Sequence, residues 1–150
     1  MRSALTSINP PNTDNIFDGV KGIEWRTKPL PTGLHYCYET KNLGGAGKVI
    51  GEFTVWRVKR YKSASFVPET EIDLGCVPKE FLIAYSKGKP LYANYIAKPR
   101  RYEQPKEIWE FCHPCDRDPQ CDCNYCKRHG GSKPVLRAPQ SWCYVEEVPR

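Results

Sequence analysis

One short stretch of the chain carries more charge than a plain turn needs: Gly19-Val20-Lys21-Gly22-Ile23-Glu24-Trp25-Arg26. If this segment is extended from Ile23 onward, Glu24 and Arg26 point to one face while Ile23 and Trp25 point to the other. The stretch is therefore predicted to be a strand with one packed face and one face available for chemistry. The same spacing is also compatible with a surface ion pair, which contributes only about 0–1 kcal/mol.

The composition favours one β-rich domain with an anionic partner. A length of 150 residues is the usual size of a single domain, so one domain is predicted over residues 1–150. Nine Tyr and four Trp favour a core of strands and aromatic side chains, and fourteen Pro and eleven Gly indicate many turns. The formal charge of +6 permits nucleic-acid binding without requiring it.

The N-terminal residues 1–9 do not resemble a signal peptide, and no stretch is apolar enough for a membrane span. We therefore expect a cytoplasmic protein that does not contact a membrane. We also expect a monomer. In the cytosol the eight cysteines are expected to be thiols or metal ligands rather than disulfides.

The order of elements predicts an α+β fold. Breakers and hydrophobic periodicity predict short helices at residues 9–19, 78–88 and 105–111 and strands at residues 22–26, 34–40, 48–60, 91–97 and 141–148. The strand at 48–60 carries apolar residues on both faces, including Phe53 on one and Trp56 on the other, as in a covered sheet. Because strands and helices do not alternate regularly, we predict a small mixed β-barrel with short helices at its ends.

A cysteine-rich insert at residues 112–129 predicts a structural zinc ion. Two C-x2-C pairs provide the four thiolates of a tetrahedral site, namely Cys112, Cys115, Cys123 and Cys126. The spacing leaves alternatives open, because Cys121 can replace Cys123, and His113 or His129 can complete a site of three cysteines and one histidine. A disulfide pair or an unmetallated thiol cluster is the competing interpretation. Outside the insert, Cys37, Cys76 and Cys143 are expected to be free, buried thiols.

The pattern G-x-K-x-x-E-x-R, present as Gly19, Lys21, Glu24 and Arg26, resembles the signature of the ASCH family, whose domains share the PUA-like pseudo-barrel of RNA-binding modules. The segments 47–53 and 139–145 also resemble strands of ASCH-like proteins from bacteria and phages. Together these pieces touch most of the chain outside residues 112–137. The cysteine insert departs from the minimal family pattern.

The resemblance implies a cleft beside the motif that handles RNA or nucleotides. Some family members resemble amidohydrolases that act on acetylated cytidine and use the motif lysine, and others are linked to RNA cleavage. The amidohydrolase type carries threonine where this chain has Glu24, so the identity of the nucleophile differs from that pattern.

The leading hypothesis is a nucleic-acid-binding module, with RNA as the expected partner. Lys21 and Arg26 would hold phosphate, and Glu24 would orient Arg26 or accept from a base or a ribose hydroxyl. The full predicted set is Lys21, Glu24, Arg26, Tyr38, Lys41, Gln140, Ser141 and Trp142. The candidate stacking surfaces for bases are Trp25, Tyr36, Tyr38 and Trp142, with the barrel core as the alternative location. For Trp25 the core is favoured, because this residue should lie opposite Glu24.

Two other hypotheses remain open. In the first, the chain is an enzyme on a modified nucleoside or on RNA, with Glu24 as general base and Lys21 as nucleophile or oxyanion stabiliser. In the second, the metal-clipped insert is a protein-interaction module whose contact surface contains Tyr125, Lys127 and Arg128.

Overall fold

The computed structural model describes residues 3–114 and 133–147. Its strands are β1 (Ser3–Ile8), β2 (Ile23–Arg26), β3 (Gly33–Glu39), β4 (Lys48–Tyr61), β5 (Leu91–Lys106), β6 (Phe111–His113), β7 (Lys133–Pro134) and β8 (Trp142–Glu147). Its α-helices are α1 (Asn12–Phe17), α2 (Glu69–Gly75) and α3 (Lys79–Ser86). Short 3-10 turns lie at Asn42–Gly44, Ala64–Phe66 and Ile108–Glu110. The predicted α+β class is therefore confirmed.

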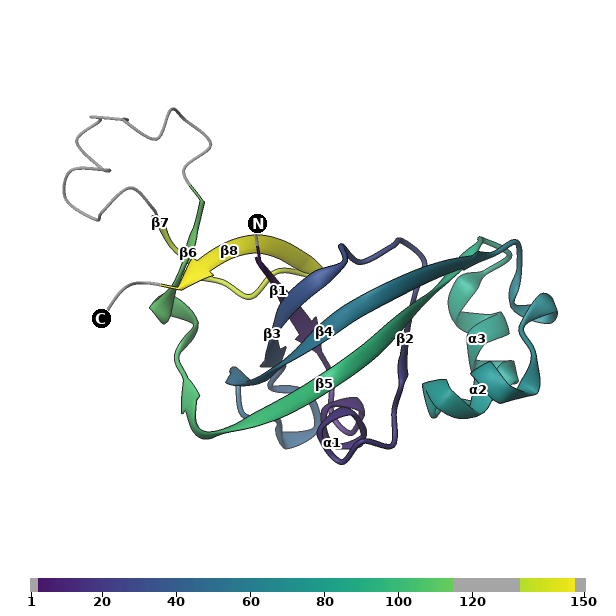
Figure 1. Ribbon diagram of the computed structural model, residues 1–150, viewed down its shortest axis with the longest axis horizontal. Helices are drawn as coiled ribbons and strands as arrows, with labels where there is room; N and C mark the ends of the chain where they lie inside the picture. The colour runs from purple at the N-terminus through teal and green to yellow at the C-terminus, as the bar shows by residue number, and fades with distance from the viewer. Residues whose placement is uncertain (1–2, 115–132, 148–150) are drawn as a thin grey trace.

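The strands form one mixed sheet in the order β2-β5-β4-β3-β1-β8-β6-β7. The pair β1 and β3 is parallel, and the other neighbours are antiparallel. Among the described strands β2 and β7 are edges that do not pair with each other, so the predicted barrel is corrected to an open sheet. Figure 1 shows α2 and α3 at one end of the long strands β4 and β5, and β6 and β7 at the other.

Most of the predicted helices and strands are present, but they begin or end at other residues than predicted. The hairpin predicted from residues 34–40 and 48–60 is the antiparallel pair β3 and β4. The helix predicted at 9–19 is shorter at both ends, and the side-chain oxygen of Asn9 accepts hydrogen bonds from Thr40 and Asn42 instead of capping it. The helix predicted at 105–111 is wrong, since β5 continues to Lys106 and only a 3-10 turn follows.

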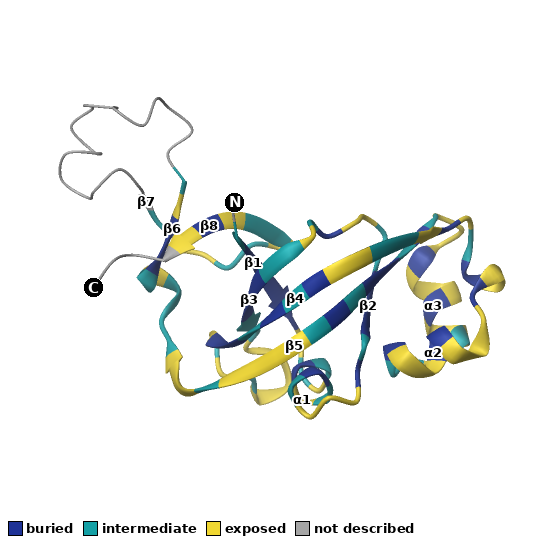
Figure 2. Ribbon diagram, viewed as in Figure 1, coloured by how far each residue is buried: buried dark blue, intermediate teal, exposed yellow. Residues whose placement is uncertain are grey.

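The strand β4 is covered on both faces only in its first half. At Gly51 an added Cβ atom would lie 2.6 Å from the Phe17 ring, which shows that α1 packs directly on this part of the strand. Further along β4, Trp56 is 56% exposed, so the prediction that this side chain is buried is wrong. Figure 2 shows exposed positions on β4 and β5 alternating with buried ones.

Three hydrophobic clusters make up the described core. The first joins β2 to α2, α3 and the start of β5, the second lies between α1 and the central strands, and the third lies under β6 and β8. No helix within residues 3–114 and 133–147 is both long and apolar enough to cross a membrane.

The prediction of a structural zinc ion is wrong for the described part of the chain. The predicted ligands Cys115, Cys123 and Cys126 and the alternates Cys121 and His129 lie outside the described residues. Within residues 3–114 and 133–147, no group of three or more His, Cys, Asp or Glu side chains is placed to hold a metal ion. Of the two candidate ligands that are described, Cys112 is a buried thiol that donates a 3.3 Å hydrogen bond to the carbonyl oxygen of Glu146, and the alternate His113 is exposed. Cys37 is a free, buried thiol as expected, whereas Cys76 and Cys143 are free thiols that are partly exposed, so the expectation of burial is wrong for these two.

Candidate functional site

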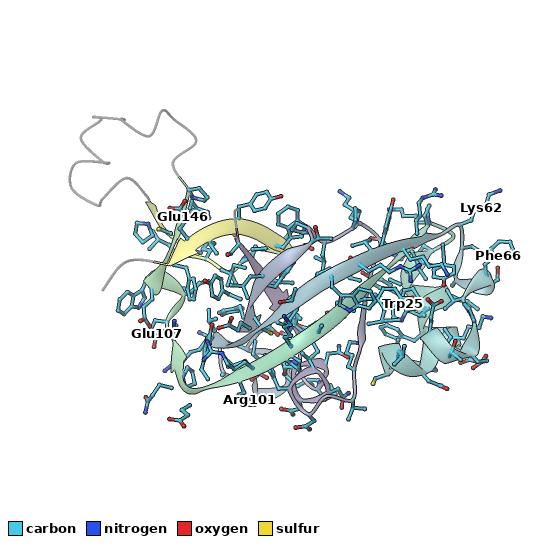
Figure 3. The ribbon with its side chains drawn as sticks, viewed as in Figure 1. Trp25, Lys62, Phe66, Arg101, Glu107 and Glu146 are labelled. Carbon is cyan, nitrogen blue, oxygen red and sulfur yellow. The ribbon has the colours of Figure 1, made fainter. Side chains whose placement is uncertain are left out.

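The edge strand β2 presents opposite faces as its alternation predicts. Ile23 and Trp25 are buried in the cluster shared with α2 and α3, whereas Glu24 lies on the other face. Figure 3 shows Trp25 at the end of the sheet where α2 and α3 lie. The buried amide of Asn94 holds the strand in place, because its Nδ2 donates 2.9 Å to the Glu24 carbonyl and its Oδ1 accepts 2.9 Å from the Leu30 amide.

The Lys21 side chain is almost fully enclosed, with the residue only 3% exposed. Its Nζ donates a hydrogen bond to the carbonyl oxygen of Gly75, the last residue of α2, and lies 3.9 Å from Glu24 Oε1. Burial lowers the pKa of the Lys21 ammonium, while the negative charge of Glu24 acts in the opposite direction. The site thus contains an amine for which the neutral form is easier to reach than in water.

Arg26 connects β2 to β1 and to the segment before β8. Its Nη2 donates 2.8 Å to the Ser7 carbonyl and lies 3.3 Å from Glu24 Oε2, and its Nη1 donates 3.2 Å to the Ser141 hydroxyl. Glu24 therefore lies between two cations, with one oxygen towards Lys21 and the other towards Arg26. A carboxylate in this position offsets part of the free-energy cost of burying the two positive charges.

These three charged residues share one cleft of about 230 Å³. Its lining comes from β1, α1, β2, α3 and the loops around them: Ser7, Asn9, Asn12, Lys21, Glu24, Trp25, Arg26, Thr40, Val77, Phe81, Tyr85 and Gln140. Hydroxyl and amide side chains surround the charges, and an apolar contribution comes from α3 and the residue Val77 before it. The cleft thus offers donors, acceptors and apolar surface to one small ligand.

The predicted site residues divide into two groups. Lys21, Glu24, Arg26 and Gln140 line the cleft, and the hydroxyl of Ser141 reaches it through Arg26. Tyr38, Lys41 and Trp142 do not line it. Tyr38 packs beside the third hydrophobic cluster, and Trp142 packs beside the second and meets Tyr144 edge to face at 5.0 Å.

The sequence did not indicate the contributions of Phe81 and Tyr85. In the predicted helix Phe81, Leu82 and Tyr85 recur at i, i+1 and i+4, a spacing typical of an inward face. Leu82 is the only one of the three that is buried. The signal that was available is the i, i+4 spacing of the two rings, which places them side by side on the helix surface.

The arrangement of elements is that of solved ASCH proteins. The crystal structure of an ASCH protein from Zymomonas mobilis has a TM-score of 0.68 and 16% identity, covering 96% of this chain and 87% of its own. A tyrosine-to-phenylalanine variant of the Zymomonas protein gives a TM-score of 0.69 and 15% identity, with 97% and 91% covered. No family model matches the sequence, and no curated protein does. At this identity the likeness shows the fold, which is the ASCH fold.

Proposed function

We propose that this chain, which has the fold of ASCH proteins, binds RNA in the cleft lined by Lys21, Glu24 and Arg26. The observation that carries the proposal is the convergence of two cations and one carboxylate in a cleft that also offers hydroxyl and amide groups. The PUA-like architecture of RNA-binding modules supports RNA over other anions, and the net charge of +6 favours a polyanion.

Arg26 is the residue proposed to contact phosphate. A guanidinium carries five N–H donors. The bonds that Arg26 makes within the described residues use Nη2 twice and Nη1 once. Among the described residues the Nε–H group and the second Nη1–H group have no partner, and because these two groups lie on different edges of the guanidinium, each would donate a single charge-assisted hydrogen bond to a phosphate oxygen. Glu24 and Ser141 hold the group in position before the ligand arrives.

The test is the binding of a short single-stranded RNA across a range of salt concentrations. For single strands the log–log slope is about −0.7 for each neutralised phosphate. Arg26→Ala is expected to make the slope shallower by about 0.7. Arg60→Ala is the matched control, because Arg60 is an exposed arginine of β4 outside the cleft. Thermal unfolding of both variants separates lost contact from lost fold. A salt response equal to that of wild type in Arg26→Ala would exclude the phosphate role.

A second candidate function is an enzyme on a modified nucleoside, and the burial of Lys21 is the observation that favours it. An amine whose pKa is lowered by burial and that lies 3.9 Å from a carboxylate has the features of a nucleophile with an adjacent base. The neutral amine of Lys21 would attack the acyl carbonyl carbon, the bond from that carbon to the nucleoside nitrogen would break, and Glu24 would carry the proton from the Lys21 amine to the leaving nitrogen. Water would then hydrolyse the acyl-lysine and regenerate the amine. Turnover of acylated cytidine that is abolished by both Lys21→Ala and Glu24→Ala supports this function, and turnover that survives both substitutions refutes it.

A further inference from the structure

The helix α3 presents two stacked aromatic rings at the cleft. Phe81 is 53% exposed and Tyr85 is 39% exposed. Their ring centroids are 6.0 Å apart and the planes differ by 7°, so the rings are nearly parallel. Both residues line the same cleft as Lys21, Glu24 and Arg26. The helix is anchored to the core by Leu82, which is fully buried, so neither ring is needed to seal the core.

The position of these rings beside charged groups distinguishes them from the other exposed apolar side chains of the helical pair. Leu74 on α2 and Ile83 on α3 are also exposed, yet neither lines the cleft. A ligand that touches Phe81 and Tyr85 therefore also meets an arginine, a lysine and a carboxylate. A nucleotide has this combination, because its base has apolar faces and its phosphate is an anion.

The size of the cleft limits the ligand to a small unit. Pockets for drug-sized ligands have volumes of about 300–1,000 Å³, and this cleft has about 230 Å³. Bases within a duplex already stack on one another, whereas the bases of single strands, loops and ends are free to stack on aromatic side chains. The cleft thus suits one nucleotide of an unpaired segment better than it suits a helix.

We infer that Phe81 and Tyr85 form a stacking surface for one unpaired RNA base whose phosphate is held at Arg26. The inference rests on the proposed RNA-binding function and specifies its ligand as single-stranded RNA. The same surface on α3 would be available to an apolar protein segment, but the three charged groups in the cleft favour a nucleotide.

The experiment compares three fluorescently labelled RNAs: a short single strand, the same strand with abasic nucleotides at its centre, and the corresponding duplex. The variants are Phe81→Ala, Tyr85→Ala and the matched control Ile83→Ala, which removes a side chain that is 52% exposed on the same helix but outside the cleft. Loss of one stacking ring is expected to weaken binding of the intact strand by about fivefold to a hundredfold. Binding of the abasic strand should hardly change, and Phe81→Trp should restore binding of the intact strand.

The outcomes separate this inference from the proposed function. If Arg26→Ala weakens binding but Phe81→Ala and Tyr85→Ala bind the intact strand as wild type does, the stacking surface is refuted and RNA binding stands. Equal losses for the intact and abasic strands, or for single strand and duplex, also refute stacking. If wild type binds none of the three RNAs at low salt, the proposed function fails and the inference fails with it. If the ring variants sediment differently from wild type but bind RNA with unchanged affinity, the surface on α3 is assigned to protein contact instead.

Discussion

The substitution Gly75→Ala is predicted to disturb the core and the cleft together. A Cβ atom added at Gly75 would lie 2.6 Å from Cδ1 of Trp25 and closer still to its Nε1, so the buried indole or the end of α2 must move. Overpacking of this kind costs about 1–3 kcal/mol. The gain of about 1 kcal/mol from replacing glycine by alanine applies to helix interiors, whereas Gly75 is the last residue of α2, so the expected loss in the free energy of unfolding is about 1–3 kcal/mol. The melting temperature should fall by about 2–12 °C for a chain of this size.

The assay is urea unfolding followed by tryptophan fluorescence, with Gly22→Ala as the matched control. At Gly22 the added Cβ atom would lie 3.5 Å from Leu74, which is an ordinary contact, so the free energy of unfolding should stay within about 0.5 kcal/mol of wild type. Because the Gly75 carbonyl accepts from Lys21, NMR signals of the Lys21 side chain should shift in Gly75→Ala and not in the control. Equal stability of the two variants would refute the close packing of Trp25 on Gly75.

Three further predictions concern groups outside the cleft. Both Tyr61 and Tyr95 donate hydrogen bonds to the buried carboxylate of Glu71, and burial together with Glu71 raises the pKa of Tyr95 to about 12. Glu71→Gln should lower the pKa of Tyr95. The measurement is tyrosine absorbance at alkaline pH, with Tyr95→Phe identifying the signal of this residue. Burial lowers the pKa of His35 below its ordinary value of 6.5, and the stabilising contribution of the neutral ring is complete above pH 6.5. This contribution decreases as the pH falls below that value, because the unfolded chain then binds a proton at His35 more readily than the folded protein does. Urea unfolding at several acidic pH values should therefore show a flatter pH dependence for His35→Gln. Finally, Lys87 ends α3 with φ 49°, and Lys87→Gly should raise the free energy of unfolding by up to about 1 kcal/mol because glycine adopts this conformation without strain.

Local sequence patterns predicted the elements whose signals are local. The β3–β4 hairpin follows from two aromatic, β-branched runs around a glycine-rich segment, and β2 follows from alternation after Gly22. The strand β1 was not predicted, because its sequence Ser3-Ala4-Leu5-Thr6-Ser7-Ile8 mixes buried polar and apolar residues. Its polar side chains are satisfied by distant partners, with Thr6 bonded to His35 and Ser7 to the Pro139 carbonyl. Such partners are not visible in a short window of sequence.

The candidate site was predictable only where the motif itself carries it. The spacing of Lys21, Glu24 and Arg26 indicated a charged cluster, and the described geometry brings the three together. The partner of Lys21 on α2 was not predicted, because the acidic sequence of that helix, Glu69-Thr70-Glu71-Ile72-Asp73-Leu74-Gly75, lacks an apolar stripe. The periodicity of Phe81, Leu82 and Tyr85 indicates an apolar face on α3 without assigning the two rings to a cleft, because periodicity alone cannot distinguish a face that meets the core from one that meets a cleft.

The two candidate functions require opposite charge states of Lys21, so pH separates them. With Lys21 protonated, the cleft carries two cations and one carboxylate, and the net charge of +1 matches one phosphodiester. RNA binding through Lys21 requires the protonated amine. It therefore weakens as the pH rises through the lowered pKa of Lys21. A nucleophilic amine works in the opposite sense, since its rate rises with pH until the amine is neutral. Affinity and turnover measured over the same range of pH, with Lys21→Arg as the variant that remains charged, should change in opposite directions if both functions use this lysine. If affinity and turnover have the same pH dependence in Lys21→Arg as in wild type, neither function depends on the charge state of Lys21. The lysine then serves only to join the segment before β2 to the end of α2.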